Sequence, residues 1–129
     1  MASITDVSPL APAAFPDLPV IDGVAFATAA AGVKYQGRTD VMLATLTAGT
    51  VIAGAFTRSS TRSASVLDCK AKLGKASSGT AAIVVNSGNS NAFTGKGGVE
   101  SVEAITAATA QACGTLQERV FASSTCVIG

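Results

Sequence analysis

Residues 81–112 carry the pattern that most limits how this chain can fold. An apolar run, Ala81 to Val85, is followed by Asn, Ser and Gly through Asn91, and then by a glycine-rich stretch at 95–98. A short apolar run bounded by turn residues indicates a buried strand. Apolar residues then recur at the three- and four-residue spacing of an amphipathic helix, and Gly114 can close its end: Val99, Val102, Ile105, Ala108 and Ala112. The pattern predicts a strand that ends abruptly at Asn86, a polar loop and a helix.

The remaining regular segments are predicted from their length and bounding turn residues. Residues 23–33 are expected to be a strand, 40–47 and 50–57 two strands of a hairpin joined by Ala48-Gly49, 63–72 a short helix stopped by Gly74, and 119–123 a last strand. Both faces of the hairpin strands are mostly apolar, which predicts a sheet covered on both sides. The expected order is β-β-β-α-β-α-β. This is an α/β (α+β) chain with a mixed sheet and helices packed on it.

The chain divides by composition into two parts. Residues 1–22 hold all four prolines and are predicted to form an N-terminal arm, and residues 23–129 form the α/β portion. Hydrophobic residues make up 48% of the chain, and Ala and Val contribute more of them than large aromatics do. Such a core gains less from burial per residue. We therefore expect a partner chain, or the continuation of this one, to complete the hydrophobic layer.

Charge and residue usage exclude several classes of function. The net charge is +1 and the basic residues are not interleaved with aromatics, so nothing points to nucleic acid. No apolar stretch approaches the ~20 residues that span a bilayer, and the N-terminus lacks a charged secretory leader, so a cytoplasmic protein is expected. There is no histidine, which removes Ser-His-Asp catalysis and the usual zinc sites, and no metal is expected. The three cysteines are expected to be reduced thiols.

Two polar segments could carry chemistry. Asn86 to Gly95 follows a buried strand, where α/β proteins place ligands, although Asn and Gly are also the residues that tolerate positive φ in a turn. Residues 122–129 place Ser123, Ser124 and Thr125 at a strand end, where consecutive N–H groups and a hydroxyl can stabilise an oxyanion. Ordinary turn residues are the simpler interpretation of both segments.

The sequence assigns Cys126 and the basic side chains structural or solvent-facing roles. No cationic residue is nearer to Cys126 in sequence than Arg119, so nothing in the sequence lowers its pKa and a structural or lining role is predicted.

Five basic residues flank the predicted hairpin and short helix. Their spacing is typical of a solvated face, although they could help hold a carboxylate-bearing substrate. These residues are Arg58, Arg62, Lys70, Lys72 and Lys75.

Several of these segments together resemble the glutamate/ornithine N-acetyltransferase family of arginine biosynthesis. Residues 23–34 look like the family's early Gly-x-x-x-Ala-x-x-x-Ala-Gly-Val-Lys stretch, 40–43 and 53–57 like its hairpin, and 83–95 like its Asn/Gly-rich motif. Ser124-Thr125-Cys126-Val127-Ile128-Gly129 is similar to its Ser-Thr-Gly-Val-Ile-Gly segment.

The resemblance implies the N-terminal part of an α chain that is cleaved from a β chain in one precursor. A threonine at the new β N-terminus, with its own amine as base, would pass acetyl from N-acetylornithine to glutamate. The implied assembly is an α2β2 heterotetramer with an αββα-type layered sandwich, without a cofactor, and with acetyl-CoA as a further substrate only in bifunctional members. Thr125 and Cys126 correspond to the oxyanion hole. Cys126 replaces the family glycine, which introduces strain if the position needs positive φ.

Two alternatives stay open from the sequence. One is an N-terminal-nucleophile aminopeptidase or amidase of related architecture, which would pass its acyl group to water. The other is a non-catalytic binding module, in which the Asn/Gly loop binds a small ligand or only makes a turn.

Overall fold

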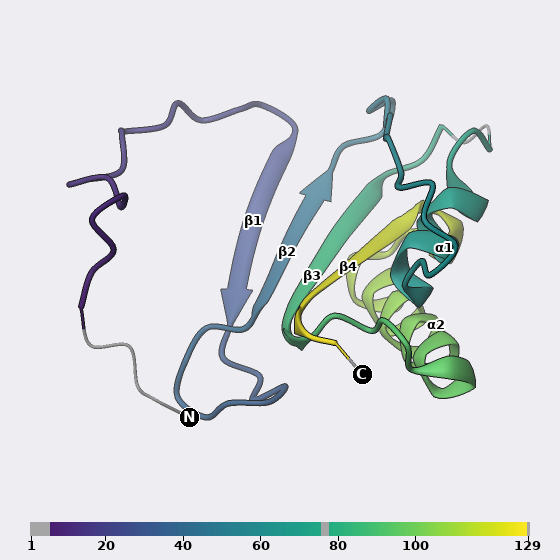
Figure 1. Ribbon diagram of the computed structural model, residues 1–129. Helices are drawn as coiled ribbons and strands as arrows, with labels where there is room; N and C mark the ends of the chain where they lie inside the picture. The colour runs from purple at the N-terminus through teal and green to yellow at the C-terminus, as the bar shows by residue number, and fades with distance from the viewer. Residues whose placement is uncertain (1–5, 76–77, 129) are drawn as a thin grey trace.

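The computed structural model describes residues 6–75 and 78–128 as a four-stranded sheet with two helices (Figure 1). The strands lie side by side in sequence order: β1 (Val24–Ala29), β2 (Val41–Leu46), β3 (Ala81–Asn89) and β4 (Val120–Val127). β1–β2 and β2–β3 are antiparallel, and β3–β4 is parallel. The helices are α1 (Ala64–Lys72) and α2 (Gly95–Cys113), and a 3-10 turn spans Gln117–Arg119. The predicted mixed sheet with packed helices is confirmed.

Both helices end where the sequence predicted. The Ser63 hydroxyl caps α1 by accepting the Val66 N–H, and Gly74 follows its end in a left-handed conformation. Gly114 closes α2 with φ 61°. Helix α2 begins at Gly95 rather than after the glycine stretch. Its first turn forms there because the Gly98 N–H bonds to the Thr94 carbonyl and the Asn91 amide donates to the Gly98 carbonyl.

The predicted strand at 50–57 is wrong. The Ala48-Gly49 turn is present, and the Thr50 N–H and hydroxyl both donate to the Thr47 carbonyl. The chain after the turn is irregular, because β1 and β3 already occupy both edges of β2 and leave no ladder for a further strand. The observed order is therefore β-β-α-β-α-β, with β1 taking the place beside β2 that the hairpin would have filled.

Strands β3 and β4 extend further than predicted. β3 continues from Val85 to Asn89, and β4 from Ser123 to Val127. Their polar ends pair with each other in parallel, from Asn86 opposite Ser124 to Asn89 opposite Val127. Pairing with a neighbouring strand overrides the turn preference of Asn, Ser and Gly. The Ser-Thr-Cys segment is therefore part of a strand and not a loop beyond one.

The core lies between the sheet and α2 and consists of small side chains, as the composition suggested. Its buried residues are Ala82, Val84, Val102, Ala110, Val120 and Ala122. Helix α1 lies along β4, where the Cys69 thiol and the Lys72 ammonium donate to the Ala122 and Val120 carbonyls. It thereby covers one edge of the sheet.

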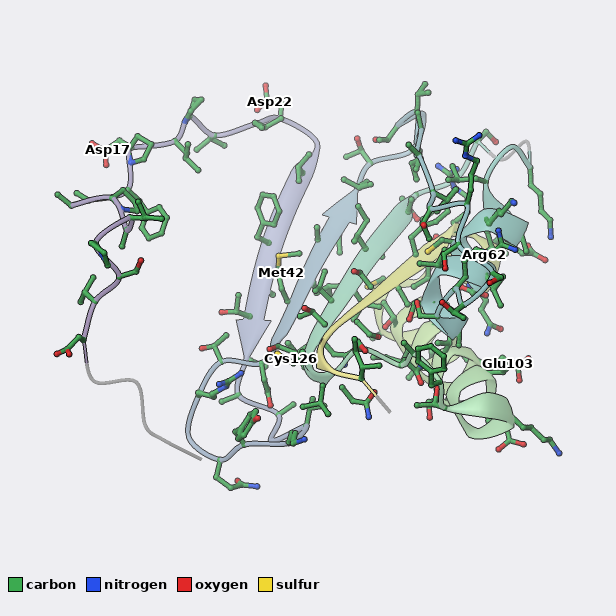
Figure 2. The ribbon with its side chains drawn as sticks, in the orientation of Figure 1. Asp17, Asp22, Met42, Arg62, Glu103 and Cys126 are labelled. Carbon is green, nitrogen blue, oxygen red and sulfur yellow. The ribbon has the colours of Figure 1, made fainter. Side chains whose placement is uncertain are left out.

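Strand β1 lies at the sheet edge farthest from β4 and α1, whereas Val41 and Leu43 of β2 pack against the core. Five of the six residues of β1 are exposed, and Phe26 keeps 68% of its surface accessible. Figure 2 shows Met42 among these side chains, on the part of the sheet away from α1 and α2. The expectation of a sheet covered on both sides included a partner chain and stays a prediction. The apolar surface of β1 is available to another layer.

The described part of the N-terminal arm, residues 6–22, contains no helix or strand and loops away from the sheet in Figure 1. Its apolar side chains are exposed, among them Leu10 and Phe15. The division at residue 22 stays a prediction. In the parts of the chain that the structure describes, no helix combines the length and the apolar character needed to cross a membrane.

Candidate functional site

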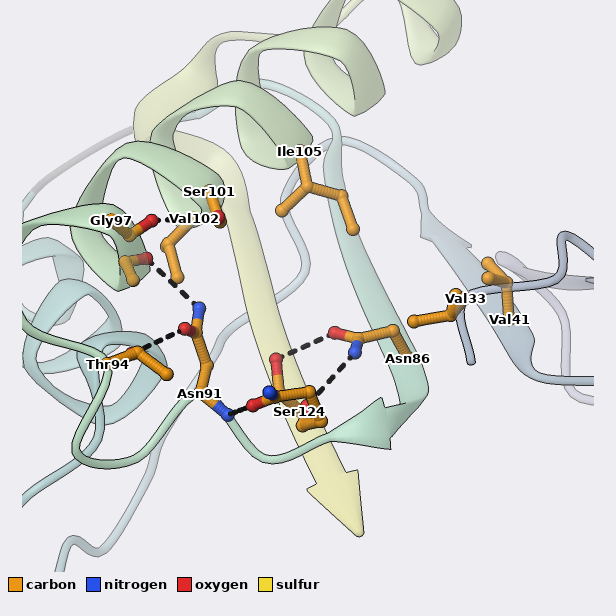
Figure 3. A pocket seen from close by; sticks show the side chains of 12 residues that line it. Val33, Val41, Asn86, Asn91, Thr94, Gly97, Ser101, Val102, Ile105 and Ser124 are labelled. Atoms are coloured by element: carbon orange, nitrogen blue, oxygen red, sulfur yellow. Dashed lines mark hydrogen bonds between the residues drawn. The ribbon is translucent and has the colours of Figure 1, made fainter. Parts of the chain in front are cut away.

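The carboxyl ends of β3 and β4 bring the two polar segments of the sequence together. The Ser124 hydroxyl donates to Asn86 Oδ1 over 2.7 Å (Figure 3). Ser90 donates twice to the Val127 carbonyl, from its backbone N–H over 2.7 Å and from its hydroxyl over 2.8 Å. The Asn/Gly segment and the Ser-Thr-Cys segment therefore form one end of the sheet.

Thr125 lies exposed in this end of β4, opposite Ser87 of β3. Successive side chains of a strand point to opposite faces, so Thr125 faces away from Ser124 and from helix α2. A reacting group supplied from outside the described residues can therefore reach Thr125 without displacing the core.

Cys126 adopts φ +91°, a left-handed conformation that favours glycine. The sequence left open whether the position needs such a φ, and in this structure it does. The cysteine is therefore held in a strained backbone conformation. Such strain clusters at functional sites, because the surrounding structure must maintain it.

The sequence neighbourhood of Cys126 suggested a thiol isolated from charged groups. In the structure a charged group is close to it. Its Sγ lies 3.1 Å from Ser87 Oγ, which in turn accepts a bond from Arg38 Nη2 over 3.3 Å. The Ser87 hydroxyl, helped by the Gly88 N–H and by Arg38, lowers the pKa of the thiol against a smaller opposing effect of burial. Arg38 is distant in sequence, so the prediction that nothing lowers this pKa is corrected.

Arg38 is positioned by a loop that Asp40 anchors. The Asp40 carboxylate is buried and accepts the Ala31 and Val33 N–H groups, each over 2.7 Å. Burial acts to raise the pKa of Asp40, but these backbone donors outweigh it and the pKa lies below its ordinary value. Figure 2 shows Cys126 at the end of β4, where this loop passes. The sequence placed Asp40 only at the start of the 40–43 stretch and did not indicate that it anchors a loop, and Arg38 was missed.

The Asn86–Gly95 segment uses its amides internally. Asn86 Nδ2 donates to the Asn89 carbonyl, and Asn89 Oδ1 accepts the Asn91 N–H. Asn91 Oδ1 accepts the Thr94 hydroxyl, and Asn91 itself has φ 57°. These bonds favour the turn interpretation of the segment.

A cavity of about 520 Å³ lies between this segment and α2 (Figure 3). Amide and hydroxyl side chains line it together with the apolar Val33, Val102 and Ile105. Ser124 borders the cavity, so Thr125, which points to the opposite face, does not. This cavity and the predicted oxyanion residue are therefore separate features.

The basic set does not converge on Thr125. Lys72 is buried and pairs with Asp68 over 2.7 Å, which corrects the prediction of a uniformly solvated face. Arg58, Lys70 and Lys75 are exposed. In residues 6–75 and 78–128, no three Cys, Asp or Glu side chains gather closely enough to hold a metal ion.

Known proteins are similar to this chain in sequence and in fold. The ArgJ family matches residues 25–129. The chain is 69% identical to the arginine biosynthesis bifunctional protein ArgJ of Ruegeria pomeroyi, over all of this chain and 32% of that protein. It is 51% identical to the protein of the same name from Nitrobacter winogradskyi, over 97% of this chain and 30% of that protein.

Two solved structures share its architecture. A crystal structure of arginine biosynthesis bifunctional protein ArgJ from Bacillus halodurans matches with a TM-score of 0.74 and 28% identity, over 84% of this chain and 56% of that one. Ornithine acetyltransferase from Mycobacterium tuberculosis, solved with ornithine, matches with a TM-score of 0.69 and 33% identity, over 84% of this chain and 58% of that one. The chain spans about a third of the length of its curated relatives.

Proposed function

This chain belongs to the ArgJ family, and we propose that it is the α-chain portion of an N-acetyltransferase that moves acetyl from N-acetylornithine to glutamate. The observation that carries the proposal is the family match over residues 25–129. The likeness to an ornithine acetyltransferase solved with ornithine supports the substrate class. The absence of histidine from the sequence agrees with a reaction whose base is an amine.

In the proposed reaction the nucleophile is a threonine at the N-terminus of a β chain cleaved from the same precursor. Its α-amine takes the proton of its hydroxyl, and the oxygen attacks the acetyl carbonyl of N-acetylornithine. The tetrahedral oxyanion collapses to an acetyl-threonine ester and releases ornithine as a protonated amine. The amine of glutamate then attacks the ester, and N-acetylglutamate leaves while the threonine is restored.

Thr125 and Cys126 are proposed to stabilise the oxyanion in both steps. Thr125 is exposed on the face of β4 that points away from α2. A donor must be exposed in this way to meet a substrate held by another chain. At position 126 the donor is the backbone N–H, which glycine and cysteine share. The positive φ of Cys126 is the conformation that a glycine would adopt without strain. The function thus requires the backbone at 126 and not the thiol.

The partner proposed for the exposed surface of β1 and the half-buried β2 beside it is the β chain, in an α2β2 assembly of layered αββα type. Phe26 and the apolar residues around it would be buried by that second layer. We propose a cytoplasmic enzyme without a cofactor, for which acetyl-CoA is an additional substrate if the protein is bifunctional.

The test uses the complete gene product and follows acetyl transfer with and without glutamate. Thr125→Ala should lower kcat by about 10²- to 10³-fold, the usual effect of one lost oxyanion donor. Thr125→Ser, which retains the hydroxyl, should recover most of the activity, and Ser123→Ala provides a matched control on the same face of β4. Cys126→Gly should remain active.

Two outcomes would contradict the proposal. Unchanged turnover in Thr125→Ala would remove this residue from the mechanism. Free acetate as the sole product in the presence of glutamate would identify a hydrolase instead.

A further inference from the structure

A second polar cavity lies at the other end of β4 from Thr125. It has a volume of about 250 Å³ and is bordered by the 49–52 turn, the end of α1 and the start of β4. Three cationic side chains line it, Lys72, Lys75 and Arg119, and no acidic side chain among the described residues does. We call it the Arg119 cavity.

Arg119 is the most unusual group of this cavity. Its side chain is 7% exposed, and its Nη2 donates to the Thr50 carbonyl over 3.2 Å and to the Gly79 carbonyl over 3.4 Å. Its Nε is buried and has no hydrogen-bond partner among the described residues. A guanidinium keeps its charge at all physiological pH values, so it cannot escape burial by losing a proton.

No carboxylate neutralises this charge within the described part of the chain. The two ion pairs found there join Lys72 to Asp68 and Lys96 to Glu100. Lys72 is therefore satisfied by Asp68 and by the Val120 carbonyl, whereas Arg119 bonds only to neutral carbonyl oxygens. Burying a charge without a counter-charge is costly. The cavity thus retains the positive charge of Arg119 and that of Lys75 at its exposed rim.

We propose that the Arg119 cavity binds a small oxyanion, either phosphate or the carboxylate of a small acid. The guanidinium of Arg119 lines the cavity and would donate to one anion oxygen, and Lys75, which also lines it, would donate to another. Charge-assisted bonds of this kind are shorter and stronger than neutral ones, and a guanidinium suits planar or tetrahedral oxyanions. The proposal does not depend on acetyl transfer, since the cavity lies at the opposite end of β4 from Thr125.

The experiment titrates the complete gene product with inorganic phosphate, and separately with succinate, by calorimetry in a chloride buffer of constant low ionic strength. At least one of the two anions should bind with one site per chain, and comparison of the two identifies the source. Arg119→Gln should weaken that binding about tenfold or more, as expected for a lost charge-assisted bond. Arg119→Lys should recover part of it.

Two further variants keep the test decisive if Arg119→Gln does not fold. Lys75→Gln removes an exposed charge at the cavity and should weaken binding several-fold. Lys70→Gln removes an exposed charge from the same helix end, outside the cavity lining, and should leave binding unchanged. Binding of neither anion, equal loss in the Lys70 and Lys75 variants, or an acidic side chain of the complete protein occupying the cavity would overturn the proposal.

Discussion

The hydroxyl of Ser124 stands 2.7 Å from Asn86 Oδ1 and 3.1 Å from the hydroxyl of Ser65. It joins the last strand to β3 on one side and to α1 on the other, one residue before Thr125. A single small side chain thereby sets the position of the segment on which the proposed oxyanion stabilisation rests.

Ser124→Ala should lower the free energy of unfolding by about 1–3 kcal/mol. The variant loses two hydroxyl contacts and leaves the side-chain Oδ1 of the half-buried Asn86 without its donor. Ser123→Ala is the matched control, because its side chain is exposed and its hydroxyl makes no hydrogen bond to a described residue. Urea denaturation of the complete protein measures both. Equal midpoints for the two variants would show that the Ser124 contacts contribute nothing to stability.

Cys126→Gly should raise the melting temperature by a few degrees, whereas Cys126→Ala should not. Glycine adopts the observed φ of +91° without steric cost, and alanine keeps the Cβ that causes the strain. The comparison separates backbone strain from loss of the thiol, since both variants lack sulfur. Thermal unfolding measured side by side provides the test, and a gain shared by both variants would assign the effect to the thiol.

Alkylation of Cys126 by iodoacetamide should reach its midpoint at a lower pH than alkylation of Cys69. The Ser87 hydroxyl lowers the pKa of Cys126, whereas burial raises that of Cys69. Ser87→Ala should move the Cys126 midpoint upward, and Ser101→Ala, which removes an exposed hydroxyl from α2, should leave it in place. Peptide mass spectrometry across pH 6–10 resolves the two thiols. An unchanged Cys126 midpoint in Ser87→Ala would contradict the conclusion that the Ser87 hydroxyl lowers the pKa of Cys126.

Local signals in the sequence predicted most of the elements. The helical spacing from Val99 to Ala112 and the stops at Gly74 and Gly114 depend only on neighbouring residues, and all three were confirmed. The strand expected at 50–57 failed, because its existence depends on a free sheet edge, which strand order decides and local composition does not. The polar ends of β3 and β4 were read as loops for the same reason: each is a strand only because the other is present.

The candidate site divides in the same way. Thr125 and Cys126 were found through a resemblance in a short segment of the chain, and their catalytic role stays a prediction. Arg38 was missed, and Ser87 was singled out only as part of the Asn86–Gly95 segment. Both reach Cys126 through the pairing of β3 with β4 and through the loop that Asp40 holds. Contacts between residues far apart in sequence leave no periodic or motif signal in a single chain.

Asp40 should make the stability of this fold sensitive to acid. Backbone donors hold the pKa of its carboxyl below the ordinary value of about 3.9, so the ionised form is the one that stabilises the native state. When folding lowers the pKa of a group, its contribution to the free energy of unfolding is fully present above the pKa that the group has in the unfolded chain. That contribution is lost as the pH falls through the folded value. The advantage of Asp40 is therefore complete at pH 6 and declines below about pH 4.

Asp40→Asn removes this dependence and supplies the measurement. The amide keeps one acceptor oxygen but places an NH2 group against the N–H of Ala31 or Val33, so the variant should melt several degrees lower at pH 6. Asp22→Asn, an exposed carboxylate in the arm, is the control and should match the unsubstituted protein. Melting temperatures from pH 2.5 to 7 should show the Asp40→Asn curve approaching the other two in acid. A gap of constant size would mean that packing of the 30–39 loop, and not the charge of Asp40, holds Arg38 beside Ser87.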